Sequence, residues 1–365
     1  MLAEFDIMIR PNIQKKATMK HLAASPHATA NNRFLRLTLC LLLFAAACAW
    51  RSPAYAQQKI SFPSAEYANK FEMAKKPGKP VEIFGYLSMP SIPVSGKIPV
   101  VIIAHGSAGV EAKDTGFWAP YFNKLGFASF VVDSFTPRGV ASTVTDQELV
   151  SNAADTADAF FALKFIAADP RFDANKIGII GFSRGGLAAN ETSTKSFRDN
   201  VLRDDKNLQF AFHIPVYAGC QNSRYRKNGS FDRTGAPMLF LMGGKDDYTP
   251  AKFCLDQIKG MQEEYPGVID YRVYEGANHS FDNNQGAHYL QMGTSTRDCP
   301  MVETDVPSWA RSVVPTGQRL SLSEEKQMYK DCVKRGVTVG SYDSKYRETA
   351  ARDIEDFLRK IKMID

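Results

Sequence analysis

The stretch KIGIIGFSRGGLAAN, residues 176–190, decides how the rest of the chain is interpreted. Its first half is an apolar run of the kind that forms a buried strand, and its second half is rich in small residues and predicts a helix. Between the two halves, residues 181–185 read Gly-Phe-Ser-Arg-Gly and fit the motif G-x-S-x-G, which places a nucleophilic serine on a sharp strand-to-helix turn. Glycine is needed two positions before and after the serine, because a side chain there would collide with the neighbouring strand or helix. We therefore predict that Ser183 is a catalytic nucleophile.

Apolar runs and helical patterns alternate on both sides of this stretch. Short runs rich in Val and Ile, bounded by Gly and polar residues, are typical of buried parallel strands. The alternation predicts an α/β fold in one domain, with a mostly parallel sheet, helices on both faces and an antiparallel strand, residues 81–89, at one edge. The other predicted strands are 99–104, 128–132, 176–181, 210–217, 237–242 and 268–274, and the predicted helices lie near 117–125, 147–168, from 185, from 250 and over 346–361.

Residues 285–343 interrupt this alternation. They are rich in Thr, Ser, Pro and charged residues, with one short helical stretch near 324–333. We expect a loop-rich insertion into the domain that spans residues 57–365. Such an insertion either shapes a substrate pocket at the carboxyl edge of the sheet or is a surface excursion without a role in binding.

A serine nucleophile needs a histidine base, which is itself oriented by a carboxylate. His279 lies in a glycine-bearing loop, residues 275–281, directly after the predicted strand 268–274. The chain order serine, acid, histidine is the one this strand–turn–helix architecture uses, so His279 is the predicted base. His213 lies inside an apolar strand, and we expect it to be a core or pocket residue.

The acid should follow a strand between Ser183 and His279. Asp246 and Asp247 both come after the apolar run 237–242, and only one of them can orient the imidazole. We choose Asp246 because it lies several residues into the turn, four positions before a proline that begins a helix. Asp247 remains the alternative acid, and otherwise places a negative charge at the start of that helix.

Two backbone amides are expected to bind the oxyanion. One is the amide after the nucleophile, that of Arg184, and the other comes from a loop after an earlier strand. Residues 105–109, His-Gly-Ser-Ala-Gly, follow the strand 99–104, and we assign the second donor to Ser107, with Ala108 next in preference.

Two further residues keep two interpretations each. Arg138 either binds a substrate carboxylate or pairs with Asp133 and fixes the loop between them. Tyr217 follows the strand 210–217 and either lines the pocket or packs in the core.

The N-terminal segment has the pattern of a secretory signal peptide. Arg33 and Arg36 precede an apolar run, residues 37–50, and Ala54-Tyr55-Ala56 forms a small-x-small cleavage site. We expect cleavage after Ala56, no stable membrane span thereafter, and a periplasmic or secreted protein. The charged segment before the apolar run is unusually long, and a start at Met19, followed by Lys20, would be more typical of a signal peptide, which suggests that residues 1–18 come from a wrongly assigned start. The run is shorter than the roughly 20 residues that span a bilayer.

Charge and composition exclude several classes of protein. The chain is 44% hydrophobic and 23% charged, which is typical of a globular protein. Residues 1–56 hold seven basic and two acidic residues, so 38 of the 45 basic and 37 of the 39 acidic residues belong to the rest. A body so nearly neutral has no electrostatic footprint for nucleic acid.

Four cysteines remain after the leader: Cys220, Cys254, Cys299 and Cys332. An even number in an exported protein indicates disulfide bonds, with three connectivities open. We favour Cys220–Cys254 with Cys299–Cys332, because each pair would bracket one segment beside the predicted site. No Cys/His spacing indicates a metal site.

Taken together, these pieces resemble the dienelactone hydrolase family of the α/β-hydrolases. The resemblance covers about residues 81–279 and the last helix, and the matching motifs are His105-Gly106, Asp133 with Arg138-Gly139, residues 181–186, residues 243–246 with Pro250, and residues 276–281. It implies an eight-stranded α/β sheet, a nucleophile–His–Asp triad and cofactor-free hydrolysis of esters or lactones. The chain departs from the type enzymes, which are cytosolic and use cysteine where this chain has Ser183.

The sequence thus predicts an exported serine hydrolase that cleaves a carboxylic ester or lactone through an acyl-enzyme, without cofactor or metal. One alternative is a peptidase of the prolyl-oligopeptidase type, but about 80 residues before the first strands leave no room for its gating domain. The other is a non-catalytic α/β-hydrolase scaffold that binds a ligand or partner. Such a scaffold usually lacks a triad member, and here all three are present.

Overall fold

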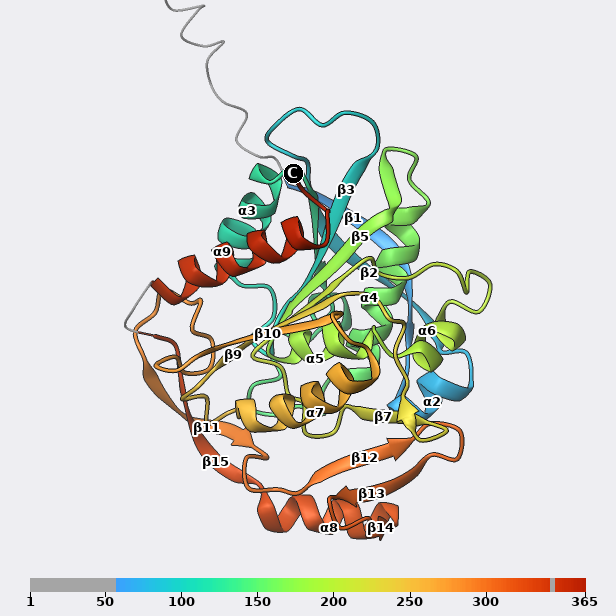
Figure 1. Ribbon diagram of the computed structural model, residues 1–365, viewed down its shortest axis with the longest axis vertical. Coiled ribbons are helices and arrows are strands. Elements are labelled where there is room, and N and C mark those ends of the chain that lie inside the picture. The colour runs from blue at the N-terminus through green and yellow to red at the C-terminus, as the bar shows by residue number, and fades with distance from the viewer. Residues whose placement is uncertain (1–56, 342–344) are drawn as a thin grey trace, which may run out of the picture. The chain divides into compact units, whose positions relative to one another are not determined.

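An eight-stranded sheet forms the centre of the computed structural model, which describes residues 57–341 and 345–365 (Figure 1). The strand order is β1-β2-β4-β3-β5-β6-β9-β10, and five of the seven neighbouring pairs are parallel. This confirms the predicted α/β-hydrolase sheet. The strands are β1 (Gln58–Glu66), β2 (Lys79–Ser88), β3 (Ile98–Ala104), β4 (Ala128–Asp133), β5 (Phe172–Phe182), β6 (His213–Val216), β9 (Met238–Gly243) and β10 (Ile269–Tyr274).

Helices cover both faces of this sheet, and the alternation of side chains along β3 separates the two cores. Val100 and Ile102 pack with α4, while Val101 and Ile103 pack on the opposite face with α3 and α9. The helices are α2 (Lys70–Lys75), α3 (Ala119–Lys124), α4 (Asn152–Ala167), α5 (Arg184–Glu191), α6 (Lys195–Val201), α7 (Ala251–Glu264), α8 (Leu322–Cys332) and α9 (Lys345–Lys360), with the single turns η1 (Asp114–Trp118) and η2 (Thr136–Arg138).

Two predictions were wrong: the place of one strand in the sheet and the start of one helix. The antiparallel strand predicted at the edge, β2, is internal because β1 pairs along its whole outer side. The sequence of β1, QKISFPSAE, is polar on one face and contains a proline, and such a pattern is confined to edge strands. Helix α4 begins at Asn152 rather than near residue 147, because Ser151 caps it through its hydroxyl and residues 147–150 form a turn.

The insertion 285–343 was predicted to be loop-rich, but it contains strands of two small sheets. β11 (His288–Ser295) pairs with β15 (Lys334–Val339). β14 (Arg319–Leu320), β13 (Ala310–Val314) and β12 (Met301–Asp305) form a second sheet with β7 (Arg224–Lys227) and β8 (Ser230–Phe231). These strands are short and rich in polar residues, so they have no long apolar run for the sequence pattern to reveal. The helical stretch near 324–333 is confirmed as α8, which a capping box between Ser321 and Glu324 begins.

All described residues belong to one compact unit, and the predicted leader, residues 1–56, lies outside them. No helix in the described ranges is long and apolar enough to cross a membrane.

Candidate active site

Ser183 occupies the turn between β5 and α5 in strained backbone geometry. Its φ of 56° and ψ of −111° lie in a region that residues with side chains rarely adopt. The flanking glycines are required sterically: a Cβ on Gly181 would lie 1.9 Å from the carbonyl oxygen of Gly185, and one on Gly185 would lie 2.1 Å from that of Ala104. The turn therefore raises the serine hydroxyl above the carboxyl end of the sheet.

The three predicted triad residues lie together. His279 Nε2 is 2.8 Å from Ser183 Oγ, and His279 Nδ1 is 2.8 Å from Asp246 Oδ2. His279 and Asp246 are both buried, at 2% and 6% exposure, so water competes little for the bond between them. This is the geometry of a serine whose proton an oriented imidazole accepts.

The two neighbouring aspartates make different contacts. Asp246 Oδ1 accepts hydrogen bonds from the amides of Tyr248 and Thr249, which leaves Oδ2 to face His279. Asp247 Oδ1 instead accepts a hydrogen bond from the amide of Thr338 in β15, at 2.8 Å. The arrangement favours Asp246 over Asp247 as the acid.

Aromatic side chains fix the plane of the His279 ring. The rings of Tyr217 and Tyr248 lie 4.8 Å and 4.7 Å from it, centroid to centroid. Tyr217 is itself held by a hydrogen bond from its hydroxyl to Asp282 Oδ1, at 2.6 Å, and burial raises its pKa well above the ordinary value. Tyr217 therefore fits both of its sequence interpretations, because it is 1% exposed, packs in the core and also borders the pocket.

The loop after β3 lies opposite the nucleophile. A turn closed by the bond from the Gly109 amide to the Gly106 carbonyl shapes this loop, and the Thr143 amide binds the Ser107 carbonyl at 2.8 Å. The amides of Ser107 and Arg184 donate to no acceptor among the described residues. Ser107 and Ala108 line the pocket that contains Ser183 and His279.

Gln147 connects this loop to the elbow. Its Oε1 accepts hydrogen bonds from Ser107 Oγ at 3.1 Å and from Arg184 Nη1 at 3.2 Å. The Arg184 guanidinium also binds the carbonyls of Gln147 and Val150 and pairs with Asp155. Sequence reasoning missed Gln147, because a lone glutamine in a turn carries no signal until the fold brings the turn to the elbow.

The pocket in front of Ser183 is small, at about 190 Å³. Lys113 lines it, with its ammonium 3.1 Å from Asp114 Oδ1 and 4.6 Å from the centroid of the Phe182 ring. Burial opposes protonation of this lysine, but the nearby carboxylates outweigh burial and raise its pKa above the ordinary value; they are those of Asp114, Asp282 and Glu111. The ammonium is therefore charged and already neutralised by this chain's own acids.

Other candidate residues serve the structure. Arg138 pairs with Asp158 and Glu66, not with Asp133, whose carboxylate accepts the amides of Phe135 and Thr136. The partner was not apparent from sequence because Asp158 lies 20 residues away, on α4. His213 is buried in β6, as expected, and burial lowers its pKa to about 3, so it is neutral.

Both favoured disulfide bonds are present. Cys220 joins Cys254, with Cα atoms 4.9 Å apart, and Cys299 joins Cys332, with Cα atoms 5.0 Å apart. The second bond ties the start of the insertion to the end of α8. Among the described residues, no group of three or more His, Cys, Asp or Glu side chains is placed to hold a metal ion.

A model of the dienelactone hydrolase family matches residues 83–297, more than half of the chain. The protein belongs to the dienelactone hydrolase family. This confirms the resemblance derived from the motifs. A protein of a Bradyrhizobium species, described as a probable 2-oxo-3-(5-oxofuran-2-ylidene)propanoate lactonase, is 27% identical over 205 residues, which are 54% of this chain and 77% of that protein.

Two solved structures are also similar to this dienelactone hydrolase family member. A putative dienelactone hydrolase from Klebsiella pneumoniae is 16% identical, with a TM-score of 0.43 over 62% of this chain and 89% of that one. Thermogutta terrifontis esterase 2 is 14% identical, with a TM-score of 0.49 over 78% of this chain and 91% of that one.

Proposed function

We propose that this protein is a serine hydrolase that cleaves a carboxylic ester or lactone through an acyl-enzyme. The observation that carries the proposal is His279, which lies within 2.8 Å of both Ser183 Oγ and Asp246 Oδ2. A hydroxyl is a weak nucleophile at neutral pH, and this contact gives it a base in position.

In the first half-reaction Ser183 Oγ attacks the ester carbonyl while its proton passes to His279 Nε2. Asp246 holds the Nδ1–H of the ring and stabilises the imidazolium that forms. The imidazolium then gives the proton to the leaving alkoxide, the ester C–O bond breaks, and an acyl-Ser183 intermediate remains.

The negative charge on the tetrahedral oxygen is stabilised by the amides of Ser107 and Arg184. Both are free to donate, and Arg184 begins α5, whose N-terminus adds a favourable dipole. In the second half-reaction a water molecule gives a proton to His279 Nε2 and attacks the acyl carbon. The bond between the acyl carbon and Ser183 Oγ then breaks, the imidazolium returns the proton to Ser183 Oγ, and the carboxylic acid is released.

The substrate class follows from the chemistry and from the relative. Nothing in this sequence of steps needs a metal or a cofactor, and the name of the Bradyrhizobium protein describes a lactonase. A lactone is a cyclic ester, so attack by Ser183 on its carbonyl opens the ring by the same step that cleaves an open-chain ester.

The protein is proposed to work outside the cytoplasm, after cleavage of residues 1–56. The two disulfide bonds support an oxidising compartment, since such bonds are rare in cytosolic proteins.

Trapping the intermediate tests the mechanism. The disulfide-bonded protein is mixed with p-nitrophenyl acetate, quenched in acid within one turnover and digested for mass spectrometry. We expect one acetyl group on the peptide that contains Ser183, and none when His279 is replaced by alanine. Turnover with an acetyl group on another residue would contradict the assignment.

A further inference from the structure

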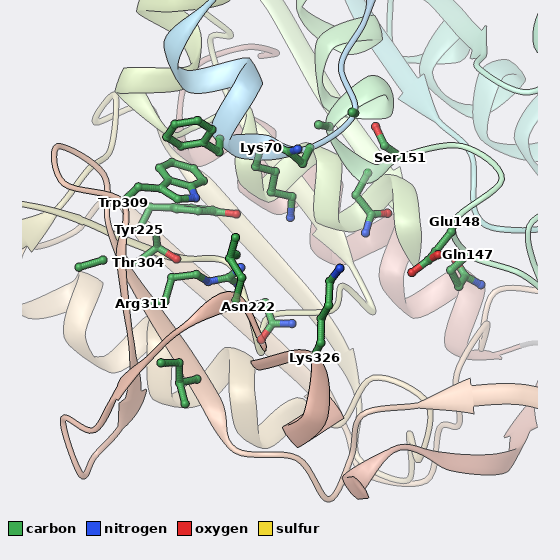
Figure 2. Close-up of a pocket in the computed structure, with 18 residues that line it drawn as sticks. Lys70, Gln147, Glu148, Ser151, Asn222, Tyr225, Thr304, Trp309, Arg311 and Lys326 are labelled. Atoms are coloured by element: carbon green, nitrogen blue, oxygen red, sulfur yellow. The ribbon is translucent and has the colours of Figure 1, made fainter. Parts of the chain in front are cut away.

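Figure 2 shows a second, much larger cleft in the structure. Its volume is about 1010 Å³, against about 190 Å³ for the pocket in front of Ser183. Its walls come from the start of α2, the turn before α4, strand β7 and, in the insertion, β12, β13 and α8. The catalytic pocket is smaller than the roughly 300–1,000 Å³ of ordinary ligand sites, so most of a larger substrate has to lie outside it.

The two spaces adjoin at Gln147. Gln147 lines the large cleft, and its Oε1 is 3.1 Å from the hydroxyl of Ser107, which lines the catalytic pocket. A substrate with its carbonyl at Ser183 and its other end in the large cleft therefore has to cross this side chain.

Three basic side chains line the cleft. Lys70, Arg311 and Lys326 line it, against one carboxylate, that of Glu148. Figure 2 shows Lys70 and Lys326 entering from opposite sides. Lys70 is paired with Glu191 and Arg311 with Glu325, so Lys326 is the lining cation whose charge no described acidic residue neutralises.

Two donors of these cations lack partners among the described residues. The Lys326 ammonium forms no ion pair with any of them, and the buried Nε of Arg311 has no acceptor. Both are donors only, so a ligand group that meets either of them must be an acceptor, and a carboxylate also matches their charge.

Aromatic rings form the wall beside these cations. The ring of Trp309 lies 6.4 Å from that of Tyr225 in a stacked arrangement and 5.6 Å from that of Phe71. Phe71 is 47% exposed and Leu322 is 71% exposed, although both are large and apolar. A flat aromatic ring is the ligand surface that covers such a wall.

The walls are fixed before any ligand arrives. The disulfide bond between Cys299 and Cys332 closes the insertion, and Arg311 pairs with Glu325 across it at 2.7 Å. The hydroxyl of Tyr329 on α8 donates to Asn222, at the edge of the cleft. A site whose walls are already ordered loses little conformational entropy when a ligand binds.

We propose that this cleft binds the alcohol portion of a large ester and that this portion is an aromatic ring bearing a carboxylate. The proposal rests on the proposed function for its catalytic half, but not for its binding half. It gives the insertion a role in substrate selection.

Binding is tested on the full chain carrying Ser183→Ala, so that nothing is hydrolysed. We expect 6-hydroxy-2-naphthoate to bind at least tenfold more tightly than 2-naphthol in a calorimetric or fluorescence titration. Lys326→Ala should weaken the naphthoate about fivefold, the scale of one exposed ion pair. Lys330→Ala, one helical turn further along α8 and outside the cleft, is the matched control and should change nothing. Absent binding, equal binding of the two naphthalenes, or equal effects of the two lysine variants would overturn the proposal.

Catalysis is tested on the protein with Ser183 intact. We expect the ratio of kcat/KM for 6-acetoxy-2-naphthoate to that for 2-naphthyl acetate to exceed ten, and to fall about fivefold in Lys326→Ala and not in Lys330→Ala. Phe71→Ala, at an exposed position that does not endanger folding, should lower kcat/KM for both naphthyl esters. A ratio near one would overturn the proposal. If neither ester were hydrolysed but the Ser183→Ala chain still bound the naphthoate, the proposed function would be overturned and the binding role of the cleft would be supported.

Discussion

The Asp247 carboxylate accepts a hydrogen bond of 2.8 Å from the amide of Thr338, so this aspartate holds the insertion rather than the base. Its neighbour Asp246 faces His279 at the same distance. The turn after β9 thus places two adjacent carboxylates in separate roles. The insertion is also tied to the histidine loop directly, because the amide of Gly340 donates to the His279 carbonyl at 2.7 Å.

Replacing each aspartate separately tests this division. Asp246→Asn should lower kcat for p-nitrophenyl acetate by about 10³–10⁴, since an amide no longer stabilises the imidazolium or selects its tautomer. Asp247→Asn should change kcat less than about threefold, because its amide oxygen still accepts the Thr338 amide. If Asp247→Asn were the more damaging change, the assignment of the acid would be reversed.

Gln147 is expected to act as a positioning residue. Gln147→Ala removes the acceptor shared by Ser107 and Arg184, whose amides are the proposed oxyanion donors. Loss of one donor costs about 10²–10³ in turnover, so a loosened pair should cost about tenfold in kcat, with little change in KM for a small ester. Gln147→Glu keeps an acceptor at the same place and should restore most of the rate.

Thr145→Ala, two positions away and exposed, is the control for Gln147. A fall in kcat that is equal in Gln147→Ala and Thr145→Ala would show that the turn as a whole, and not the glutamine oxygen, matters.

His213 should make stability fall in mild acid. Its folded-state pKa of about 3 lies below the unfolded value of about 6.5, so only the unfolded chain takes up this proton between those values. The stabilisation is complete above pH 6.5 and is lost as the pH falls toward 3. Between pH 7.5 and pH 5 the loss from this residue is about 2 kcal/mol of unfolding free energy.

Urea unfolding of the wild type and of His213→Gln at both pH values measures this loss. The variant, which has no such proton to bind, should lose about 2 kcal/mol less than the wild type over the interval. An identical pH dependence in the two proteins would show that His213 is not buried as a neutral ring.

The disulfide between Cys299 and Cys332 should stabilise the insertion. It closes a loop with a sequence separation of 33 residues, for which chain entropy predicts about 3–4 kcal/mol. Replacing both cysteines with serine should lower Tm by about 5–10 °C in a calorimetric scan. Unchanged Tm in the double variant would contradict a stabilising role.

The three residues of the proposed triad could be picked out from the sequence because each is marked by its neighbours. Ser183 has flanking glycines, and Asp246 and His279 each come shortly after a predicted strand, so the order of the strands brought them to one edge of the sheet. The same reasoning gave the mostly parallel sheet. These features depend on local pattern plus one topological rule.

The missed features depend on contacts between distant segments. Strand β12 pairs on one side with β13 and on the other with β7, almost 80 residues earlier, and neither β12 nor β7 is apolar enough to stand out. Arg138 pairs with Asp158 rather than Asp133 because α4 packs across the loop, and Gln147 matters only where its turn meets the elbow. No pattern within a few residues records such contacts.

The most direct test of the account is labelling and turnover measured together on the wild type and Ser183→Ala. The account predicts that the oxidised wild-type protein hydrolyses short-chain p-nitrophenyl esters and reacts covalently with a fluorophosphonate probe, and that a folded Ser183→Ala chain does neither. A folded wild-type protein that neither turns over these esters nor takes up the probe would contradict it and would favour a scaffold that only binds its ligand.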